Sequence, residues 1–247
     1  MGLIQNPFIQ FPSGESAFDP SDISERGLDI FANDLSNQGY SDGDVINLTD
    51  GLIDLTETWE LSHIGNTPTY EAGQQNGQDV IDFVAGESIR DLTSYTFGNQ
   101  MTVAYSVRAK GSGLQQFLMQ INGGNFLILK RSNGDIQVQA SNDVISLSTG
   151  DFTPSVDETN WWNFIITVDF SSGVGELIVY LNSTNVESSA TNGSADGTII
   201  PANYWYIPAS SNQQAFELGR FIVYNKILSS SERTSLMGFL NDFYIGS

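Results

Sequence analysis

The sequence predicts an all-β fold, an antiparallel two-sheet jelly-roll sandwich with a short C-terminal helix. Apolar and polar residues alternate over residues 101–108, which is the period of a half-buried strand. Short apolar runs farther along are separated by turn signals such as Asn133-Gly134. Hydrophobic residues make up 40% of the chain and charged residues only 15%, so the surface is rich in uncharged polar residues, as in β proteins with many turns.

The N-terminal part divides into an arm and the beginning of the domain. Residues 1–14 form an uncharged arm, which we expect to add an edge strand or to dock on a neighbouring subunit. Its apolar side chains include Ile4, Phe8, Ile9 and Phe11. Residues 15–247 are predicted to form one domain, because no repeat or change of composition divides them. Up to about residue 98 this domain is rich in glycine, with predicted strands at 45–48 and 80–84.

The second half contains the clearest elements. Predicted strands follow at 116–121, 126–130, 136–140, 162–170 and 176–182. Ser229 and Glu232 have the spacing of a capping box, which predicts the start of the one convincing helix. Leu236, Leu240 and Phe243 then recur at helical spacing, and Gly246 can end the helix. This apolar stripe is expected to pack against the sandwich.

The charge excludes several classes of function. The chain has 9 Lys+Arg and 29 Asp+Glu, hence a net charge of −20. Nucleic acid is therefore not an expected partner, since its phosphates bind clustered cations. An anionic membrane surface is disfavoured for the same reason. The chain has no cysteine and one histidine, which excludes thiolate sites and metal sites with several histidines.

Catalytic patterns are weak. Glycan hydrolysis needs two carboxylates at a fixed separation, and Asp79 and Asp82 are expected on opposite faces of one strand. Asp19, Asp22 and Glu25 lie in a predicted loop. A nucleophilic triad would have to use His63, but the chain has no Gly-x-Ser-x-Gly elbow. We therefore expect a protein without enzymatic activity.

One loop could hold calcium. Asp42, Asp44, Asn47 and Asp50 offer the hard oxygen ligands that Ca²⁺ prefers. Their spacing does not match an EF-hand, because Ile46 occupies the third ligand position. Acids in a solvated turn are the favoured interpretation. We expect no cofactor, with Ca²⁺ as the alternative.

Two aromatic segments could bind carbohydrate. Sugars stack on aromatic rings, while amides bind their hydroxyl groups. Trp161 and Trp162 are adjacent, so one should face the core and the other, expected to be Trp161, should lie near the surface. The second candidate segment comprises Asn203, Tyr204, Trp205 and Tyr206. Packing of these aromatics within the sheets is the competing interpretation.

Several segments, in order, resemble the laminin-G-like or concanavalin A-like lectin family. The Phe-Asp-Pro-Ser-Asp-Ile segment at 18–23 is similar to the opening of that family. Pro-Thr-Tyr at 68–70, the segments 76–83, 162–170 and 175–182, and above all Leu-Gly-Arg-Phe-Ile-Val-Tyr-Asn-Lys-Ile-Leu-Ser at 218–229 resemble its later motifs. The chain departs from the family pattern at Asn182-Ser183, where Asn-Gly or Asp-Gly is usual, and at Arg220, where an acid is usual.

The resemblance implies a binding scaffold for glycans or proteins, in the form common in structural proteins of bacteriophages. Residues 1–8 show no secretory signal pattern, and a virus released by lysis needs none. The leading hypothesis is a virion protein that decorates a capsid or belongs to a head fibre or tail, with other virion proteins and host-surface glycans as partners and homo-oligomerisation left open. The alternative is an extracellular or cell-surface carbohydrate-binding module, with or without calcium.

Overall fold

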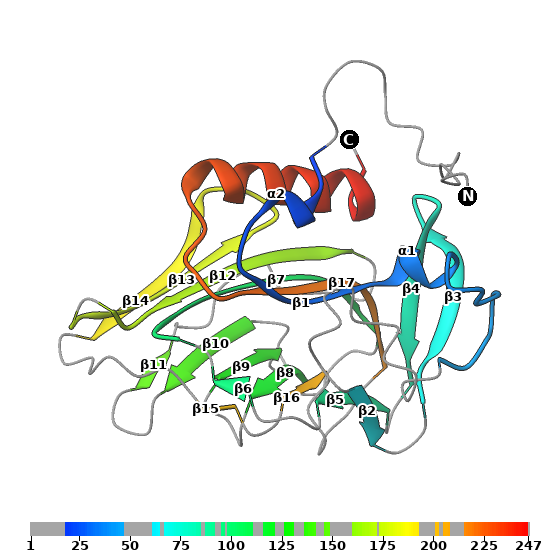
Figure 1. The fold of residues 1–247 in the computed structure, drawn as a ribbon, viewed down its shortest axis with the longest axis horizontal. Coiled ribbons are helices and arrows are strands. Elements are labelled where there is room, and N and C mark those ends of the chain that lie inside the picture. Colours follow the sequence, from blue (N-terminus) through cyan, green and yellow to red (C-terminus); the bar gives the residue numbers. More distant parts are fainter. Residues whose placement is uncertain are drawn as a thin grey trace, which may run out of the picture.

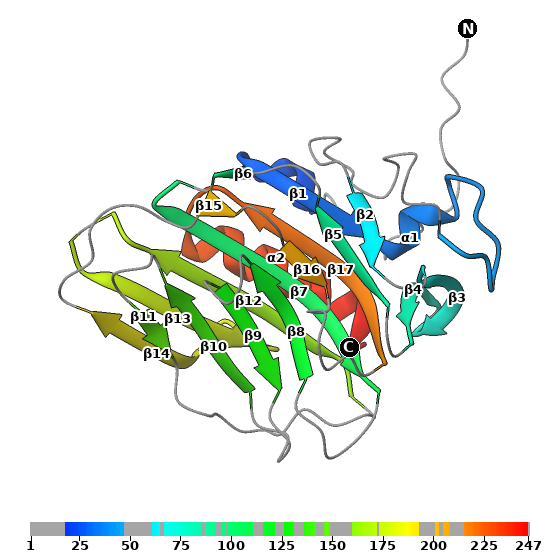
Figure 2. The ribbon, with the colours of Figure 1, turned by 90° about the horizontal axis from the view of Figure 1, so that it is seen from below.

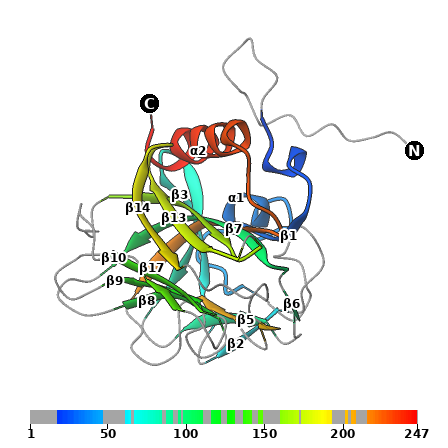
Figure 3. The same ribbon diagram turned by 90° about the vertical axis from the view of Figure 1, so that its left-hand side faces the viewer.

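The computed structural model shows a β-sandwich covered on one side by a helix (Figure 1). It describes residues 18–46, 61–64, 67–84, 87–91, 95–96, 98–110, 116–121, 126–130, 136–141, 146–148, 160–171, 173–192, 201–202, 205–207 and 215–246. Seen from the side, the helix α2 (Ser230–Tyr244) and the two sheets form three successive layers (Figure 3). The predicted antiparallel sandwich with a C-terminal helix is confirmed. The arm at 1–14, with Ile4, Phe8, Ile9 and Phe11, lies outside the described residues and stays a prediction.

The larger sheet, which we call sheet A, lies next to α2. Its strands are ordered β14 (Val186–Asn192), β13 (Gly175–Leu181), β12 (Trp162–Asp169), β7 (Gln100–Ala109), β17 (Phe216–Tyr224), β4 (Gln78–Phe83) and β3 (Thr69–Gln75). One further strand, β1 (Arg26–Phe31), also pairs with β17. The first part of β17 pairs with β4 and the second part with β1, so β17 has two partners in succession on one side.

The second sheet, sheet B, forms the far layer. Its strands are ordered β11 (Ser146–Ser148), β10 (Ile136–Ser141), β9 (Phe126–Lys130), β8 (Gln116–Ile121), β16 (Trp205–Ile207), β5 (Ser88–Asp91) and β2 (Leu61–Ile64). A separate pair joins β15 (Pro201–Ala202) and β6 (Tyr95–Thr96). The strands predicted at 116–121, 126–130 and 136–140 match β8, β9 and β10 closely.

The main core lies between the two sheets. Alternating residues of the central strands contribute to it, and Phe83 and Phe216 stack there with ring centroids 4.4 Å apart. Val103, Phe164 and Ile128 are fully buried in the same cluster. The alternation therefore separates an inner face from an outer face on both sheets.

Helix α2 buries the outer face of sheet A. Its stripe of Leu236, Met237 and Leu240 packs with Ile165 and Ile222 of the sheet in a second apolar cluster. The helix ends at Tyr244, and Gly246 follows with φ +81°, a left-handed conformation that glycine adopts without strain. The predicted helix boundaries are confirmed.

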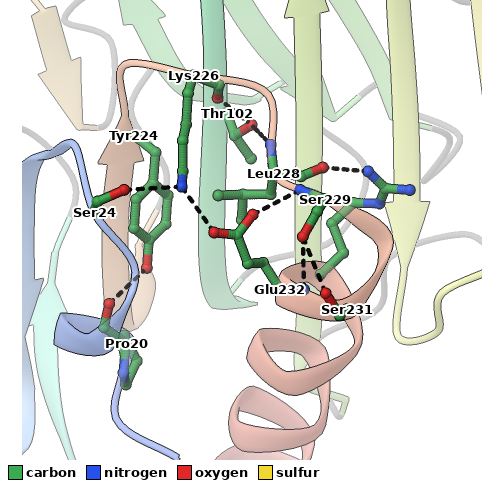
Figure 4. A network of polar contacts seen from close by, with 10 residues as sticks. Pro20, Ser24, Thr102, Tyr224, Lys226, Leu228, Ser229, Ser231 and Glu232 are labelled. Atoms are coloured by element: carbon green, nitrogen blue, oxygen red, sulfur yellow. Dashed lines mark hydrogen bonds and ion pairs between the residues drawn. The ribbon is translucent and has the colours of Figure 1, made fainter.

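A polar network fixes the beginning of α2 (Figure 4). The Ser229 hydroxyl accepts a hydrogen bond from Glu232 N, and Glu232 Oε2 accepts one from Ser229 N, so the predicted capping box is present. Lys226 Nζ donates to Glu232 Oε1 at 2.7 Å and to Ser24 Oγ at 3.1 Å. Thr102 Oγ1 donates to the Lys226 carbonyl, which ties the segment before the helix to β7.

Two short helices flank β1. The 3₁₀-helix η1 (Pro20–Asp22) is capped by Asp19, whose carboxylate accepts a hydrogen bond from Ser21 N at 2.7 Å. The helix α1 (Ala32–Leu35) directly follows β1. Phe18, at the start of the described chain, contacts Phe239 of α2 with ring centroids 6.2 Å apart. The N-terminal segment therefore enters the fold on the α2 side.

Two local expectations need comment. The strand predicted at 45–48 is not described as one: Val45 forms a single bridge with Thr69, and residues 47 and 48 lie outside the described part. At the departure from the family pattern, Asn182 adopts a left-handed conformation with φ 51°, which asparagine tolerates. Its Oδ1 accepts a hydrogen bond from Asn163 N at 2.7 Å. Asn182 thus provides the left-handed residue of this turn, while Ser183 stands where the resemblance predicts glycine.

Candidate functional site

The adjacent tryptophans lie on opposite faces of sheet A, as their spacing predicts. Trp162 belongs to the main core, while Trp161 clusters with Val80 and Tyr244 on the outer face. The prediction that Trp161 lies near the surface is wrong, because its exposure is 3%. Tyr244 of α2 stacks on it with ring centroids 4.8 Å apart. The helix thus covers the ring that was expected to bind sugar.

Part of the second aromatic segment lies in sheet B. Asn203 and Tyr204 lie outside the described residues, and Trp205 and Tyr206 begin β16. Ile207 is fully buried in the main core, so alternation places position 206 on the outer face and position 205 on the inner face. Of these four candidates, Tyr206 is the one that the strand register places on the outer face.

Strand pairing extends this position into a row across the outer face of sheet B. The row, which we call the outer row, consists of Ser62, Arg90, Tyr206, Gln120, Leu127, Gln139 and Ser148, each opposite the next on neighbouring strands. Residues adjacent to these along the strands, such as Ile89, Phe126 and Val138, are fully buried on the inner face. In Figure 2 sheet B faces the viewer and α2 lies behind both sheets.

The outer row differs in charge from the rest of the chain. The described strands of sheet B contain one carboxylate, Asp91, and alternation places it on the face of Ile89. The outer row itself contains amides, hydroxyls, one tyrosine, one leucine and Arg90. This is notable in a chain with 29 acidic residues. Sequence analysis singled out Tyr206 but missed the row, because its members come from seven strands and only the register brings them together.

The candidate calcium ligands are partly described. Asp42 Oδ1 accepts a hydrogen bond from Ala72 N at 2.9 Å, and Asp44 Oδ2 accepts one from Ser41 N at 2.7 Å. These carboxylates therefore stabilise the turn and its contact with β3. Asn47 and Asp50 lie outside the described residues. Within the described part, no three acidic, histidine or cysteine side chains form a group that could hold a metal ion.

The acids considered for hydrolysis do not form a pair. Asp79 shares a face of β4 with Ile81 of the main core, whereas Asp82 shares the outer face with Val80. Asp79 accepts hydrogen bonds from the Tyr70 hydroxyl at 2.6 Å and from Gly73 N at 3.0 Å. Burial together with the Asp79 carboxylate raises the pKa of Tyr70. The expected separation onto opposite faces is confirmed.

A charged cluster on the outer face of sheet A was not predicted. Glu217 of β17 lies opposite both Asp82 and Arg108 on the neighbouring strands. Lys110 Nζ lies 2.5 Å from Asp82 Oδ1 and 3.0 Å from Glu217 Oε1, and Arg108 Nε donates to Glu217 Oε2 at 2.5 Å. Burial opposes the charge of Lys110, but hydrogen bonds from Lys110 to both carboxylates raise its pKa overall. Each of these four side chains thus has an oppositely charged partner.

His63, the one histidine, lies in β2 opposite Ile89 of β5. In the described part of the chain, no helix has the length and apolar character needed to cross a membrane.

Comparison with known proteins shows the fold. No protein-family model and no curated protein matches the chain. Among solved structures, the ligand-binding domain of botulinum neurotoxin serotype D, in complex with N-acetylneuraminic acid, is similar with a TM-score of 0.62 and 14% identity, over 89% of this chain and 52% of that one. A botulinum neurotoxin type C structure, described by its interaction with two ganglioside molecules, matches with a TM-score of 0.57 and 14% identity, over 83% of this chain and 53% of that one.

A third similar structure is the binding domain of botulinum neurotoxin DC in complex with rat synaptotagmin II, with a TM-score of 0.57 and 13% identity, over 87% of this chain and 52% of that one. This chain therefore spans about half the length of the toxin domains that it matches. The sandwich is a fold that receptor-binding domains share.

Proposed function

We propose that this protein is a carbohydrate-binding domain without enzymatic activity. The observation that carries the proposal is the outer row, which sets Tyr206 between Gln120 and Arg90 on the outer face of sheet B. An aromatic residue beside an amide and a guanidinium group offers what sugar recognition uses, since an aromatic ring packs on the apolar face of a sugar and polar groups bind its hydroxyls.

The comparisons add support at the level of fold. The similar structures are binding domains of toxins, whose descriptions name N-acetylneuraminic acid, gangliosides and synaptotagmin II as their ligands. These ligands belong to whole domains about twice as long as this chain, so we transfer no binding residue from them. A sandwich that serves binding rather than catalysis is consistent with the arrangement of acids described above.

A glycan array tests the proposal. We expect binding to at least one glycan class in the presence of a chelator, and loss of at least about tenfold in affinity, or about 1.4 kcal/mol, for Tyr206→Ala. Val186→Ala is a control, because Val186 is 55% exposed on β14 of the other sheet. Binding to no glycan, with or without added Ca²⁺, would refute the proposal. Binding only with Ca²⁺ would instead support a calcium site at Asp42, Asp44, Asn47 and Asp50.

A separate experiment tests the expectation that the protein does not cleave its glycan. The described acids that could cut a glycan are separated onto two faces or held in ion pairs, so we expect no reaction. Incubating the bound glycan with the protein and analysing it by mass spectrometry should return it intact. Appearance of shortened or unsaturated products would show an activity.

The virion role is a second proposal, with docking through residues 1–14 and the virion as the location. One observation favours it: Phe18, the first described residue, contacts Phe239 of α2, so the described chain begins on the side of the domain opposite to sheet B. An arm docked on a particle would thus leave the outer row exposed. Co-sedimentation with particles should require residues 1–14, and association that persists after their deletion would contradict this second proposal.

A further inference from the structure

We infer that residues 1–14 dock on their own domain, on a surface of four phenylalanine rings between α2 and β1. This inference goes beyond the proposed function and does not depend on glycan binding. Its basis is that these rings form a continuous, partly exposed apolar surface, and that the arm joins the domain at that surface. The four residues, which we call the phenylalanine surface, are Phe18, Phe31, Phe239 and Phe243.

Contacts between the rings make the phenylalanine surface continuous. Phe239 and Phe243 are one turn apart on α2, and their ring centroids are 4.4 Å apart. The ring of Phe31, at the end of β1, lies 5.7 Å from that of Phe243 and 6.3 Å from that of Phe239. The ring of Phe18 lies 6.2 Å from that of Phe239. All four side chains are partly exposed, whereas Leu240 of the same helix is fully buried.

A buried arginine supports two of these rings. The guanidinium of Arg220 lies 4.2 Å from the ring centroid of Phe31 and 5.2 Å from that of Phe239. Both carboxylate oxygens of Asp29 accept hydrogen bonds from this guanidinium, which fixes it in place. Because Arg220 is buried, it stabilises the rings from inside the domain and offers no charge to a partner. The phenylalanine surface is therefore preformed and binds by apolar contact.

The chain itself supplies an occupant for this surface. Phe18 is the first described residue, and Figures 1 and 3 show the described chain beginning beside α2. The preceding arm has no charged side chain and carries Ile4, Phe8, Ile9 and Phe11. Fourteen residues can extend about 46 Å, while α2 is about 22 Å long, so the arm is long enough to cover the surface. Its tether also gives it an advantage in effective concentration over any separate partner.

The charge of the molecule disfavours a second copy or another acidic protein as the occupant. The net charge is −20, and the neighbours of Phe18 and Phe243 in sequence include the exposed Asp19 and Asp242. An acidic partner is therefore repelled. The uncharged arm meets no such repulsion, and burying its apolar side chains removes no charge from water. The inference concerns the protein free in solution; in the particle-docking proposal, the arm would leave this surface for the particle.

Proteolysis of the full chain tests the contact. Chymotrypsin cleaves after Phe8 and Phe11, and docking should protect both positions. Phe243→Gln should speed this cleavage several-fold, up to about tenfold, because the loss of one apolar ring weakens docking. Val186→Gln, at an exposed valine of the edge strand β14, should leave the rate unchanged. Mass spectrometry follows the released N-terminal peptides, and circular dichroism checks that each variant folds. An equal rate for the wild type and Phe243→Gln would overturn the inference.

Dye binding distinguishes the arm from other occupants. The full-length double variant Phe8→Ser with Phe11→Ser should bind more of the neutral dye Nile red than the wild type, because its weakened arm leaves the rings uncovered. A synthetic peptide with the wild-type sequence of residues 1–14 should displace this extra dye. Dye binding equal to that of the wild type would show that the arm does not cover the surface. Light scattering should give a monomer, and a wild-type dimer that the double variant dissociates would place the arm on a second copy. Either result overturns the inference and leaves the glycan proposal intact.

Discussion

At the scale of single residues, Gly219 shows how closely α2 approaches sheet A. A Cβ atom at Gly219 would lie 2.2 Å from Cζ of Tyr244, so the tyrosine ring occupies the space of a side chain on β17. The hydrogen-bond register of β17 shifts at this residue, between Leu218 and Arg220. The Tyr244 hydroxyl and Trp161 Nε1 are buried there with no hydrogen-bond partner among the described residues. The contact is thus stabilised by packing.

Substitution of this glycine tests the packing. Gly219→Ala should lower the free energy of unfolding by about 1–3 kcal/mol, because overpacking displaces the Tyr244 ring. Gly238→Ala is the matched control: a Cβ added at this position of α2 would meet no described atom within 4 Å, and removing a helical glycine should stabilise by about 0.5–1 kcal/mol. Urea unfolding of both variants gives the comparison. A loss of similar size at Gly238 would contradict this account.

Arg220 and Asp29 form a buried ion pair on the same face. Arg220 is 3% exposed and donates from Nε and Nη2 to the two carboxylate oxygens of Asp29 at 2.9 and 2.6 Å. Its guanidinium also lies over the rings of Phe31 and Phe239, 4.2 and 5.2 Å from their centroids. The partner of Arg220, Asp29, comes from β1, which pairs with β17.

Removing one partner of this ion pair should lower the stability of the fold more than removing both. Arg220→Met should destabilise by about 3–5 kcal/mol, since it leaves Asp29 buried with Arg26 as its remaining cation. The double variant Asp29→Leu with Arg220→Met removes both charges and should be more stable than Arg220→Met alone. Thermal unfolding of the three proteins measures the difference. A double variant less stable than the single one would show that the charge of Asp29 is not the cause.

At the scale of elements, α2 is positioned by polar contacts as well as by its apolar stripe. Asn163 of β12 is fully buried, accepts a hydrogen bond from Ser106 Oγ and donates from Nδ2 to Asn241 of α2 at 2.9 Å. Asn241 in turn donates to the Asn182 carbonyl. Because each amide satisfies another, the network fixes the helix in one register on the sheet.

The beginning of α2 should respond to pH. A hydrogen bond from Lys226 is the main cause that lowers the pKa of Glu232 below its ordinary 4.5. The folded pKa is therefore below the unfolded one, so the carboxylate stabilises the fold above about pH 4.5 and this contribution is lost as the pH falls through the folded pKa. The stability gap between the wild type and Glu232→Gln should shrink in acid. Glu187→Gln, at an exposed position, is the control, and a gap that stays constant in acid would contradict the assignment.

The elements were predictable where their signals are local. The capping box at Ser229 and the antiparallel pairing of β9 with β8 and β10 depend on signals only a few positions apart, and these predictions are confirmed. The cluster around Lys110 was not predictable, because its partner Asp82 is 28 residues away and Arg108 pairs with a residue 109 positions away. The exposure of Trp161 was predicted wrongly for the same reason, because the ring that covers it is that of Tyr244 in the distant helix α2.

At the scale of the whole molecule, the net charge of −20 opposes compaction. Among the cations whose contacts the structure describes, Arg108, Lys110 and Lys226 are already in ion pairs and Arg233 donates to the Leu228 carbonyl. The remaining acids therefore repel one another across the surface. This repulsion is screened by salt over a Debye length of about 10 Å at 0.1 M.

Salt should consequently stabilise the protein. We expect the midpoint of thermal unfolding to rise as NaCl increases from a few millimolar to about 0.15 M, because screening of many repulsive pairs outweighs the weakening of the few surface ion pairs. Differential scanning calorimetry at constant pH measures the shift. A steady fall of the midpoint over this range would show that the ion pairs dominate instead.

The position of β17 affects the order in which the molecule can form. This strand lies between β7 and its successive partners β4 and β1, yet it comes from residues 216–224. A nascent chain emerges from its N-terminus, so β1 has no described partner strand until residues 216–224 have been made. Sheet A is thus completed from its centre only after β17 has been synthesised, and chains truncated before β17 should expose unpaired strand edges and aggregate.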